Sequence, residues 1–138
     1  GHCRCGQASY QVSQTPFNSG YCHCTDCRER SSSPCTSFMM DDKAAMQYNG
    51  KTDSYKDKGG SGAYLDIHRC SECGSVLFMD VHALKNVAAI PSATLEDQSH
   101  FKPTAHYWVS SKLPWFKIED DLEQRPGPPR IPRELLNI

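Results

Sequence analysis

The sequence predicts a mainly β protein with few short helices, and three features lead to that fold class. Apolar residues rarely recur with the helical period, whereas short runs of β-type residues recur between turn residues. Glycine and proline contribute nine residues each, which is typical of a chain rich in loops. Eight cysteines, most of them in tight clusters, indicate that metal sites hold this small structure together.

The predicted strands are the short runs that lack a helical period and are separated by turn residues. They span residues 8–12, 37–40, 63–68, 76–80, 87–90 and 106–109. Turns are expected at 50–53 and at the glycine-rich stretch 59–62, which forms either a plain hairpin connection or a mobile loop beside a site. Short helical turns fit best at 25–30 and 80–84.

A length of 138 residues fits one domain, because a single core typically occupies about 100–150 residues. We expect a zinc-binding β domain over 1–123 and a proline-rich tail over 124–138. Four prolines prevent regular structure in the tail. It is either disordered or an arm that packs Leu135, Leu136 and Ile138 on its own subunit or on a neighbouring one, as in a homodimer.

Charge and hydropathy exclude two classes of partner. The net charge is −1 and the basic residues are scattered, so the sequence predicts no nucleic-acid partner. No apolar stretch approaches the roughly 20 residues of a membrane span, and no secretory signal is visible at the start. A small-molecule substrate is the remaining kind of partner.

The cysteine spacing favours metal over disulfides. The clusters are Cys3-x-Cys5, Cys22-x-Cys24-x-x-Cys27 and Cys70-x-x-Cys73. Disulfide frameworks spread their cysteines to close long loops, whereas close spacing lets several thiolates reach one zinc ion at about 2.3 Å. Reduced thiolates imply a reducing compartment, so we expect a cytoplasmic protein.

The first and last clusters together supply four soft ligands. Cys3, Cys5, Cys70 and Cys73 would close a tetrahedral zinc site with no open position, which is typical of a structural site. Gly6 and Gly74 each follow the second cysteine of a pair. They suit tight turns that aim backbone amides at the sulfurs.

The middle cluster offers three thiolates, from Cys22, Cys24 and Cys27, and no obvious fourth ligand. A zinc ion with a free fourth position is the arrangement of catalytic sites, where water, a thiol or a substrate oxygen binds. Cys35 and His23 are the candidates for a protein ligand there. His23 is expected to point away from the metal, and Cys35 is otherwise a small hydrophobe or a reactive thiol.

Proton transfer at such a site requires a nearby acid or base. His23 and Asp26 lie inside the cluster, and His68 and His106 lie on predicted strands, where a lone histidine often has a structural role. Our catalytic candidates are His23, Asp26 and His106. Three arginines could receive a substrate carboxylate or be solvated surface charges, namely Arg28, Arg30 and Arg69. Three aromatic residues either cover the core or line a pocket, namely Trp108, Trp115 and Phe116.

Four motifs in this order resemble the glutathione-dependent formaldehyde-activating enzyme family, which includes centromere protein V. They read Gly-His-Cys-Arg-Cys-Gly, Tyr-Cys-His-Cys-Thr-Asp-Cys-Arg, Cys-Ser-Glu-Cys-Gly-Ser-Val-Leu and His-Tyr-Trp-Val-Ser-Ser-Lys-Leu-Pro-Trp-Phe. The resemblance runs from Cys3 to about Ile118.

The resemblance implies coiled antiparallel sheets of the β-tent, or Mss-four-like, type stapled by two zinc ions. It implies a structural zinc on Cys3, Cys5, Cys70 and Cys73 and a catalytic zinc on Cys22, Cys24 and Cys27. The implied activity is that of a carbon–sulfur lyase, which condenses glutathione as co-substrate with formaldehyde to S-hydroxymethylglutathione.

The chain departs from the family pattern over residues 31–38 and at Arg69, both beside the expected pocket. Two alternatives therefore stay open. One is a biosynthetic lyase, dehydratase or isomerase that acts on a secondary metabolite. The other is a non-catalytic module in which zinc staples a β scaffold that binds a partner protein.

Overall fold

The computed structural model describes residues 1–59 and 62–137 and confirms a mainly β fold with few short helices. The strands are β1 (Ser9–Val12), β2 (Asn18–Cys22), β3 (Thr36–Asp42), β4 (Met46–Asn49), β5 (Thr52–Lys58), β6 (Tyr64–Cys70), β7 (Val76–Val81), β8 (Val87–Pro91), β9 (Ala105–Tyr107) and β10 (Glu123–Gln124). The helices are α1 (Thr25–Ser31) and the 3-10 turns η1 (Lys43–Ala45), η2 (Ser92–Thr94), η3 (Gln98–His100), η4 (Val109–Ser111) and η5 (Arg133–Leu135). No helix in these ranges is long and apolar enough to cross a membrane.

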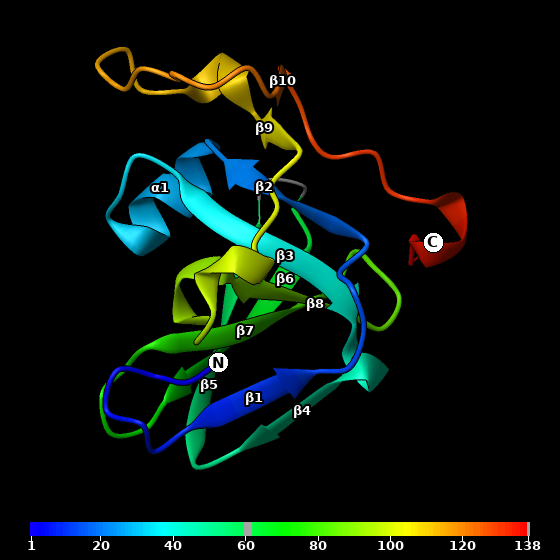
Figure 1. Cartoon of the computed structure of the whole chain (residues 1–138). Helices are drawn as coiled ribbons and strands as arrows, with labels where there is room; N and C mark the ends of the chain where they lie inside the picture. The colour runs from blue at the N-terminus through cyan, green and yellow to red at the C-terminus, as the bar shows by residue number, and fades with distance from the viewer. Residues whose placement is uncertain (60–61, 138) are drawn as a thin grey trace.

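The strands form one large sheet and one small one (Figure 1). The large sheet has the order β10-β9-β2-β3-β8-β7-β6-β5, and β1 pairs with β4 in the two-stranded sheet. Most neighbours are antiparallel, as expected, but β9 runs parallel to both β2 and β10. The parallel pairing matters for function because it brings a late segment of the chain beside β2, which leads into the middle cysteine cluster.

All six predicted strands overlap observed ones, and α1 confirms the helix expected at 25–30. Two expectations were wrong. The run 106–109 leaves the sheet after Tyr107, because Trp108 adopts a left-handed conformation. The residues expected as a helical turn at 80–84 instead complete β7 and enter a non-helical turn. Of the glycine-rich turn at 59–62, residues 60 and 61 lie outside the described ranges.

Strands β2, β4 and β5 have no strong signal in the sequence. Strand β5 is an exposed edge strand rich in charge, so it lacks the apolar alternation that identifies a half-buried strand. Strand β2 contains Gly20, a residue that ordinarily weakens a strand. Here glycine is required, because the neighbouring strand β9 approaches its backbone closely.

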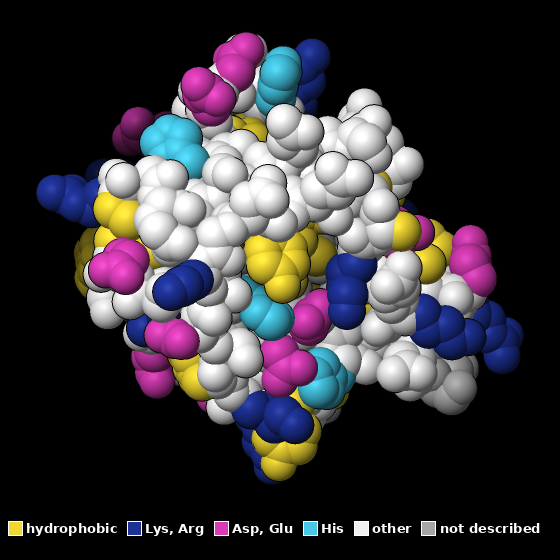
Figure 2. Space-filling view, turned by 90° about the horizontal axis from the view of Figure 1, so that it is seen from below, with side chains coloured by type: hydrophobic (Ala, Val, Ile, Leu, Met, Phe, Trp, Pro, Cys, Tyr) yellow, Lys and Arg dark blue, Asp and Glu magenta, His cyan; other side chains and the backbone are white. Residues whose placement is uncertain are grey.

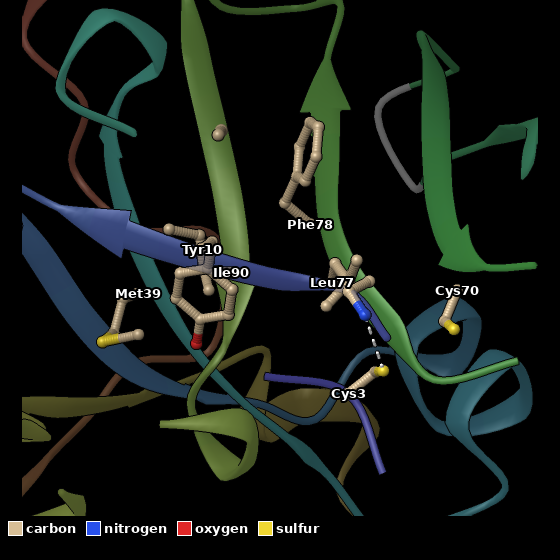
Figure 3. Packing of buried hydrophobic residues seen from close by; sticks show 9 residues of the cluster. Cys3, Tyr10, Met39, Cys70, Leu77, Phe78 and Ile90 are labelled. Carbon is tan, nitrogen blue, oxygen red and sulfur yellow. Dashed lines mark hydrogen bonds between the residues drawn. The ribbon is translucent and has the colours of Figure 1, made fainter. Parts of the chain in front are cut away.

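The main core lies where the two sheets meet the N-terminal segment. Its fully buried members include Leu77 of β7 and Ile90 of β8, and Tyr10 of β1 packs against them. Figure 3 shows Cys3 and Cys70 next to Leu77, at one end of this cluster. The first and last cysteine pairs therefore close one end of the hydrophobic core.

The proline-rich tail lies on its own chain (Figure 1). After β10 it runs past the large sheet, and near its end the Lys85 amide donates to the Leu135 carbonyl at 2.6 Å. The Asn137 amide donates to the Ala83 carbonyl at 2.9 Å, and Leu136 forms a bridge with Leu84. Of the two expectations for the tail, the structure shows the packed arm, although Ile138 lies outside the described residues.

Replacing Gly20 with Ala should destabilise the protein. The added Cβ would lie 2.6 Å from the Ala105 carbonyl oxygen and 2.8 Å from Tyr107 Cε2, so β9 must shift. We expect a loss of about 1–3 kcal/mol in the free energy of unfolding, measured by urea denaturation. Gly127→Ala is the matched control, because its Cβ meets no atom within 4 Å. Equal stabilities of the two variants would contradict the close approach of β9.

Candidate functional site

The four-cysteine cluster unites two distant parts of the chain. Cys3 and Cys5 precede β1, Cys70 ends β6, and Cys73 lies in the turn before β7. All four sulfur atoms lie within 4.8 Å of one another, with Cys3–Cys5 and Cys5–Cys70 Sγ separations of 3.6 and 3.7 Å. Four sulfurs placed tetrahedrally at about 2.3 Å from zinc are separated by about 3.8 Å. The donor set and its spacing therefore fit a closed zinc site.

Backbone amides support these sulfurs in two similar turns. The Ala8 amide donates to Cys3 Sγ at 3.3 Å, and the Glu72 amide donates to Cys70 Sγ at 3.4 Å. Gly6 and Gly74 have φ of 81° and 78°, a region that side chains disfavour, which explains glycine at both positions. Amide hydrogen bonds of this kind stabilise the thiolate form, which is the form that binds metal.

The second cluster is built at the junction of β2 and α1. Cys22 ends β2, Cys24 is the N-cap residue of α1, and Cys27 lies in the first turn of that helix. The Cys27 amide donates to Cys24 Sγ at 3.3 Å, so the sulfur caps the helix as a serine hydroxyl would. The three sulfur atoms lie within 4.8 Å of one another, and we call them the cysteine trio.

The three thiols of the trio cannot all ionise easily without a cation. Hydrogen bonds from Cys22 and Cys27 lower the pKa of Cys24 to about 2. The same contact raises the pKa of Cys22, because a thiolate already lies beside it. The trio therefore holds one thiolate readily and resists a second negative charge, which a divalent cation would neutralise.

Cys35 lies outside this arrangement. Its sulfur does not join the group of three within 4.8 Å of one another, and burial raises the pKa of its thiol. The hydroxyls around it bind backbone atoms instead, since Ser33 Oγ donates to the Cys35 carbonyl at 2.7 Å. Cys35 is thus not placed as a fourth ligand of the trio.

A buried histidine pair forms a second polar feature next to the trio. His23 Nε2 lies 2.9 Å from His106 Nδ1, and His106 Nε2 lies 2.9 Å from Asp120 Oδ2. Burial, followed by the charges of His106 and Lys112, lowers the pKa of His23 to about 4, so its imidazole is neutral near pH 7. No local sequence signal identifies Asp120, because its contact with His106 depends on the path of the chain after residue 107.

The histidine pair lies on the opposite face of the sheet from Cys22 of the trio. Tyr21 of β2 is opposite His106 of β9, and the two rings stack with centroids 4.7 Å apart. Cys22 is opposite Tyr107 and packs against the cluster of Phe38, Ala105 and Tyr107. Because side chains alternate along strands, His106 projects from the face of β2–β9 opposite to Cys22.

The remaining candidates have varied surroundings. Asp26 lies in the first turn of α1, and no hydrogen bond or ion pair of its carboxylate occurs in the described part of the chain. His68 binds Asp80 and stacks on Phe78, which is a structural role away from the trio. The three candidate arginines all have protein partners: Arg30 pairs with Asp57, Arg69 donates to the Tyr55 hydroxyl, and Arg28 donates to the Thr25 hydroxyl. Of the candidate aromatic residues, Trp115 is exposed, and the centroid of the Phe116 ring lies 5.7 Å from that of His23.

Two hollows on the surface of the described residues do not coincide with the trio. One, of about 760 Å³, is lined by residues 10–16 and 95–97 among others, and the second, of about 250 Å³, lies beside Asp66, Asp80 and His82. Acidic and histidine side chains lie side by side on the face shown in Figure 2. Such pairs, for example His82 with Asp66 at 2.6 Å, satisfy one another. The trio is therefore the candidate site on chemical grounds rather than on cavity size.

The chain is similar to known proteins in sequence and in fold. The model of the glutathione-dependent formaldehyde-activating enzyme family matches residues 1–111, which include both cysteine clusters. The chain belongs to this family. No curated protein matches this chain in sequence. Its fold is similar to a crystal structure of a Rhodobacter sphaeroides protein, with a TM-score of 0.54, 18% identity, and coverage of 70% of this chain and 86% of that one.

The His106–Asp120 contact gives a pH-dependent prediction. The hydrogen bond from His106 lowers the pKa of the Asp120 carboxyl, so this contact stabilises the fold above pH about 4 and loses its effect as the pH falls through the folded-state value. His106→Phe keeps a ring against Tyr21 and removes the donor. We expect the Asp120 midpoint in a carboxyl-carbon NMR titration to rise toward about 3.9.

Asp66 is the control in the same titration. Its pKa is lowered by the hydrogen bond from His82, so it should keep its low midpoint in His106→Phe. The stability difference between wild type and variant should also shrink at acidic pH. An Asp120 midpoint that is the same in both proteins would rule out the contact.

Proposed function

We propose that this protein is a zinc-dependent enzyme of the carbon–sulfur lyase type, which joins the thiol of glutathione to formaldehyde. The cysteine trio carries the proposal, because three convergent sulfur atoms form a donor set with one ligand fewer than a closed zinc site requires. Family membership supports the substrate class. Cys3, Cys5, Cys70 and Cys73 would hold a structural zinc, and Cys22, Cys24 and Cys27 would hold the catalytic one.

A zinc ion bound by the trio would supply Lewis acidity, lowering the pKa of a thiol or polarising a carbonyl. In the overall reaction, the glutathione sulfur forms a bond to the formaldehyde carbon, and the thiol proton ends on the former carbonyl oxygen. The reaction needs no oxidant or reductant. The chain must therefore position two reactants and move one proton.

Asp26 is our first candidate for that proton transfer. It lies between Cys24 and Cys27 in the first turn of α1, and its carboxylate is free of protein partners in the described residues. His23 and His106 remain candidates, but the alternation of side chains directs His106 to the other face of the sheet. We therefore propose that the histidine pair fixes the backbone of the trio from the face of the sheet opposite to Cys22. The His23 amide donates to the Tyr107 carbonyl at 2.9 Å, which ties the trio to β9.

A second substrate class follows from the segment after α1. Thr36 Oγ1 donates to the Cys27 carbonyl at 3.3 Å, and Ser33 Oγ bonds Ser31 Oγ at the end of α1 at 2.7 Å, so this polar segment lies against the trio helix. Residues 31–38 are where the chain departs from the family pattern. A biosynthetic lyase, dehydratase or isomerase with a larger substrate is therefore the alternative function.

All eight cysteines are free thiols, which supports a reducing compartment such as the cytosol.

Metal analysis tests the two zinc sites separately. Purified protein should contain about two zinc ions per chain by mass spectrometry of the metal. Cys24→Ser should retain the fold and about one zinc ion, whereas Cys70→Ser should cost folding because it opens the site that closes the core. Cys35→Ser is the control and should keep both ions. A soluble Cys70→Ser protein of wild-type stability would disprove the structural site.

Turnover can be followed by NMR detection of the S-hydroxymethylglutathione adduct above its uncatalysed rate. We expect wild type to accelerate adduct formation and Cys24→Ser to lose about a hundredfold or more of that acceleration. Cys35→Ser should retain it, because its sulfur lies outside the trio. No acceleration by wild type removes glutathione and formaldehyde as substrates, and full activity of Cys24→Ser removes the trio as the catalytic site.

A further inference from the structure

Trp108 has an unusual backbone conformation at the end of β9. Its φ and ψ are 56° and 39°, in the left-handed region that bulky residues rarely occupy. Strained residues of this kind persist only where the surrounding structure holds them, and they are concentrated at functional sites. The question is what this conformation achieves for the indole.

The left-handed conformation changes the face on which the indole lies. Tyr107 projects to the face of Cys22, so a continuing strand would direct Trp108 to the opposite face, with His106. Instead, Trp108 packs against the cluster of Phe38, Ala105 and Tyr107, which Cys22 also contacts. The backbone turn therefore carries the indole to the side of the sheet where the trio lies.

Direct hydrogen bonds connect this segment to the trio. The Tyr107 carbonyl accepts from the His23 amide at 2.9 Å, and Ser111 Oγ donates to the His23 carbonyl at 3.1 Å. His23 is the residue between two cysteines of the trio. The residues on either side of Trp108 are thus bound to the backbone that positions the sulfur atoms.

The proline-rich tail holds Trp108 in place. The Trp108 amide donates to the Gly127 carbonyl at 2.9 Å, and the Val109 amide donates to the Arg125 carbonyl at 3.0 Å. The Arg125 amide donates to the His106 carbonyl at 2.8 Å, and Ser110 Oγ donates to the Pro126 carbonyl at 2.7 Å. These four bonds extend the pairing of β10 with β9 and fix the turn from its outer side.

We propose that Trp108 is a substrate-contacting wall of the trio site and that residues 125–127 of the tail act as a clamp that keeps it there. The indole offers a flat apolar surface for the carbon skeleton beside the reacting thiol of a substrate. Trp108 is only partly buried, so its ring is available to a ligand. The identity of the thiol as glutathione rests on the proposed function, whereas the wall and its clamp rest on the contacts above.

The clamp is tested with tryptophan fluorescence of the full-length protein. A Trp115→Phe background leaves Trp108 as the only tryptophan. Arg125→Pro removes the amide that binds His106, and we expect the Trp108 emission to shift to longer wavelength as the indole moves into water. Arg130→Pro is the matched control in the same tail, because the Arg130 amide makes no hydrogen bond among the described residues. Identical spectra for the two proline variants would overturn the clamp.

The wall is tested with Trp108→Gly, since glycine adopts the left-handed conformation without strain. Iodoacetamide labelling of the zinc-loaded protein, resolved by peptide mass spectrometry, should be about threefold or more faster at Cys24 in this variant, because a neighbouring barrier has been removed. Cys73 is the internal control and should react at the wild-type rate. An unchanged Cys24 rate would show that the indole does not cover the trio.

Kinetics then separates this proposal from the proposed function. With zinc content unchanged, Trp108→Gly should raise the KM for glutathione about tenfold and leave kcat within about twofold, as expected for lost ground-state contact. Trp115→Gly should have no effect, because that side chain is 67% exposed. If wild type has no activity with glutathione, the proposed substrate fails, and the labelling rates still decide the wall. An active enzyme whose KM does not change in Trp108→Gly overturns substrate contact.

Discussion

Mutual repulsion of crowded thiolates is the constraint on which this structure depends. Seven cysteine sulfurs gather in two groups, each with its sulfurs within 4.8 Å of one another, and such groups cannot all be ionised without a compensating cation. In the four-cysteine group, amides from tight turns at Gly6 and Gly74 support the sulfurs beside the buried core residue Leu77. A metal there would fix the core, whereas a metal on the trio would have three sulfur ligands, one fewer than a closed site requires.

The parallel pairing of β2 with β9 organises the second site. It gives the sheet two chemically different faces, one with Cys22, Phe38 and Tyr107 and the other with Tyr21 and His106. The hydrophobic face excludes water, which would strengthen the influence of a bound cation on a sulfur or carbonyl oxygen. On the other face, the buried histidine pair and Asp120 stabilise the frame in which the trio lies.

The tail illustrates how a segment without regular structure can become part of a site. Its prolines lack amide donors, so its carbonyls are left to accept bonds from other segments. Pro126 and Gly127 accept from the turn that contains Ser110 and Trp108, and further along Leu135 accepts from Lys85. The tail thus links the β9 end of the large sheet to the turn between β7 and β8.

The sequence by itself determined the grouping of cysteines within each cluster and the fold class, because cysteine spacing and the absence of a helical period are local properties that survive in any topology. It also located α1, where Cys24 caps the helix and brings Cys27 back toward it. Only the tertiary structure decided that His106 faces away from Cys22, that Asp120 binds His106, and that Trp108 packs against the same apolar cluster as Cys22. Those relations depend on strand register and on a left-handed backbone turn held by the distant tail, neither of which has a local sequence signature.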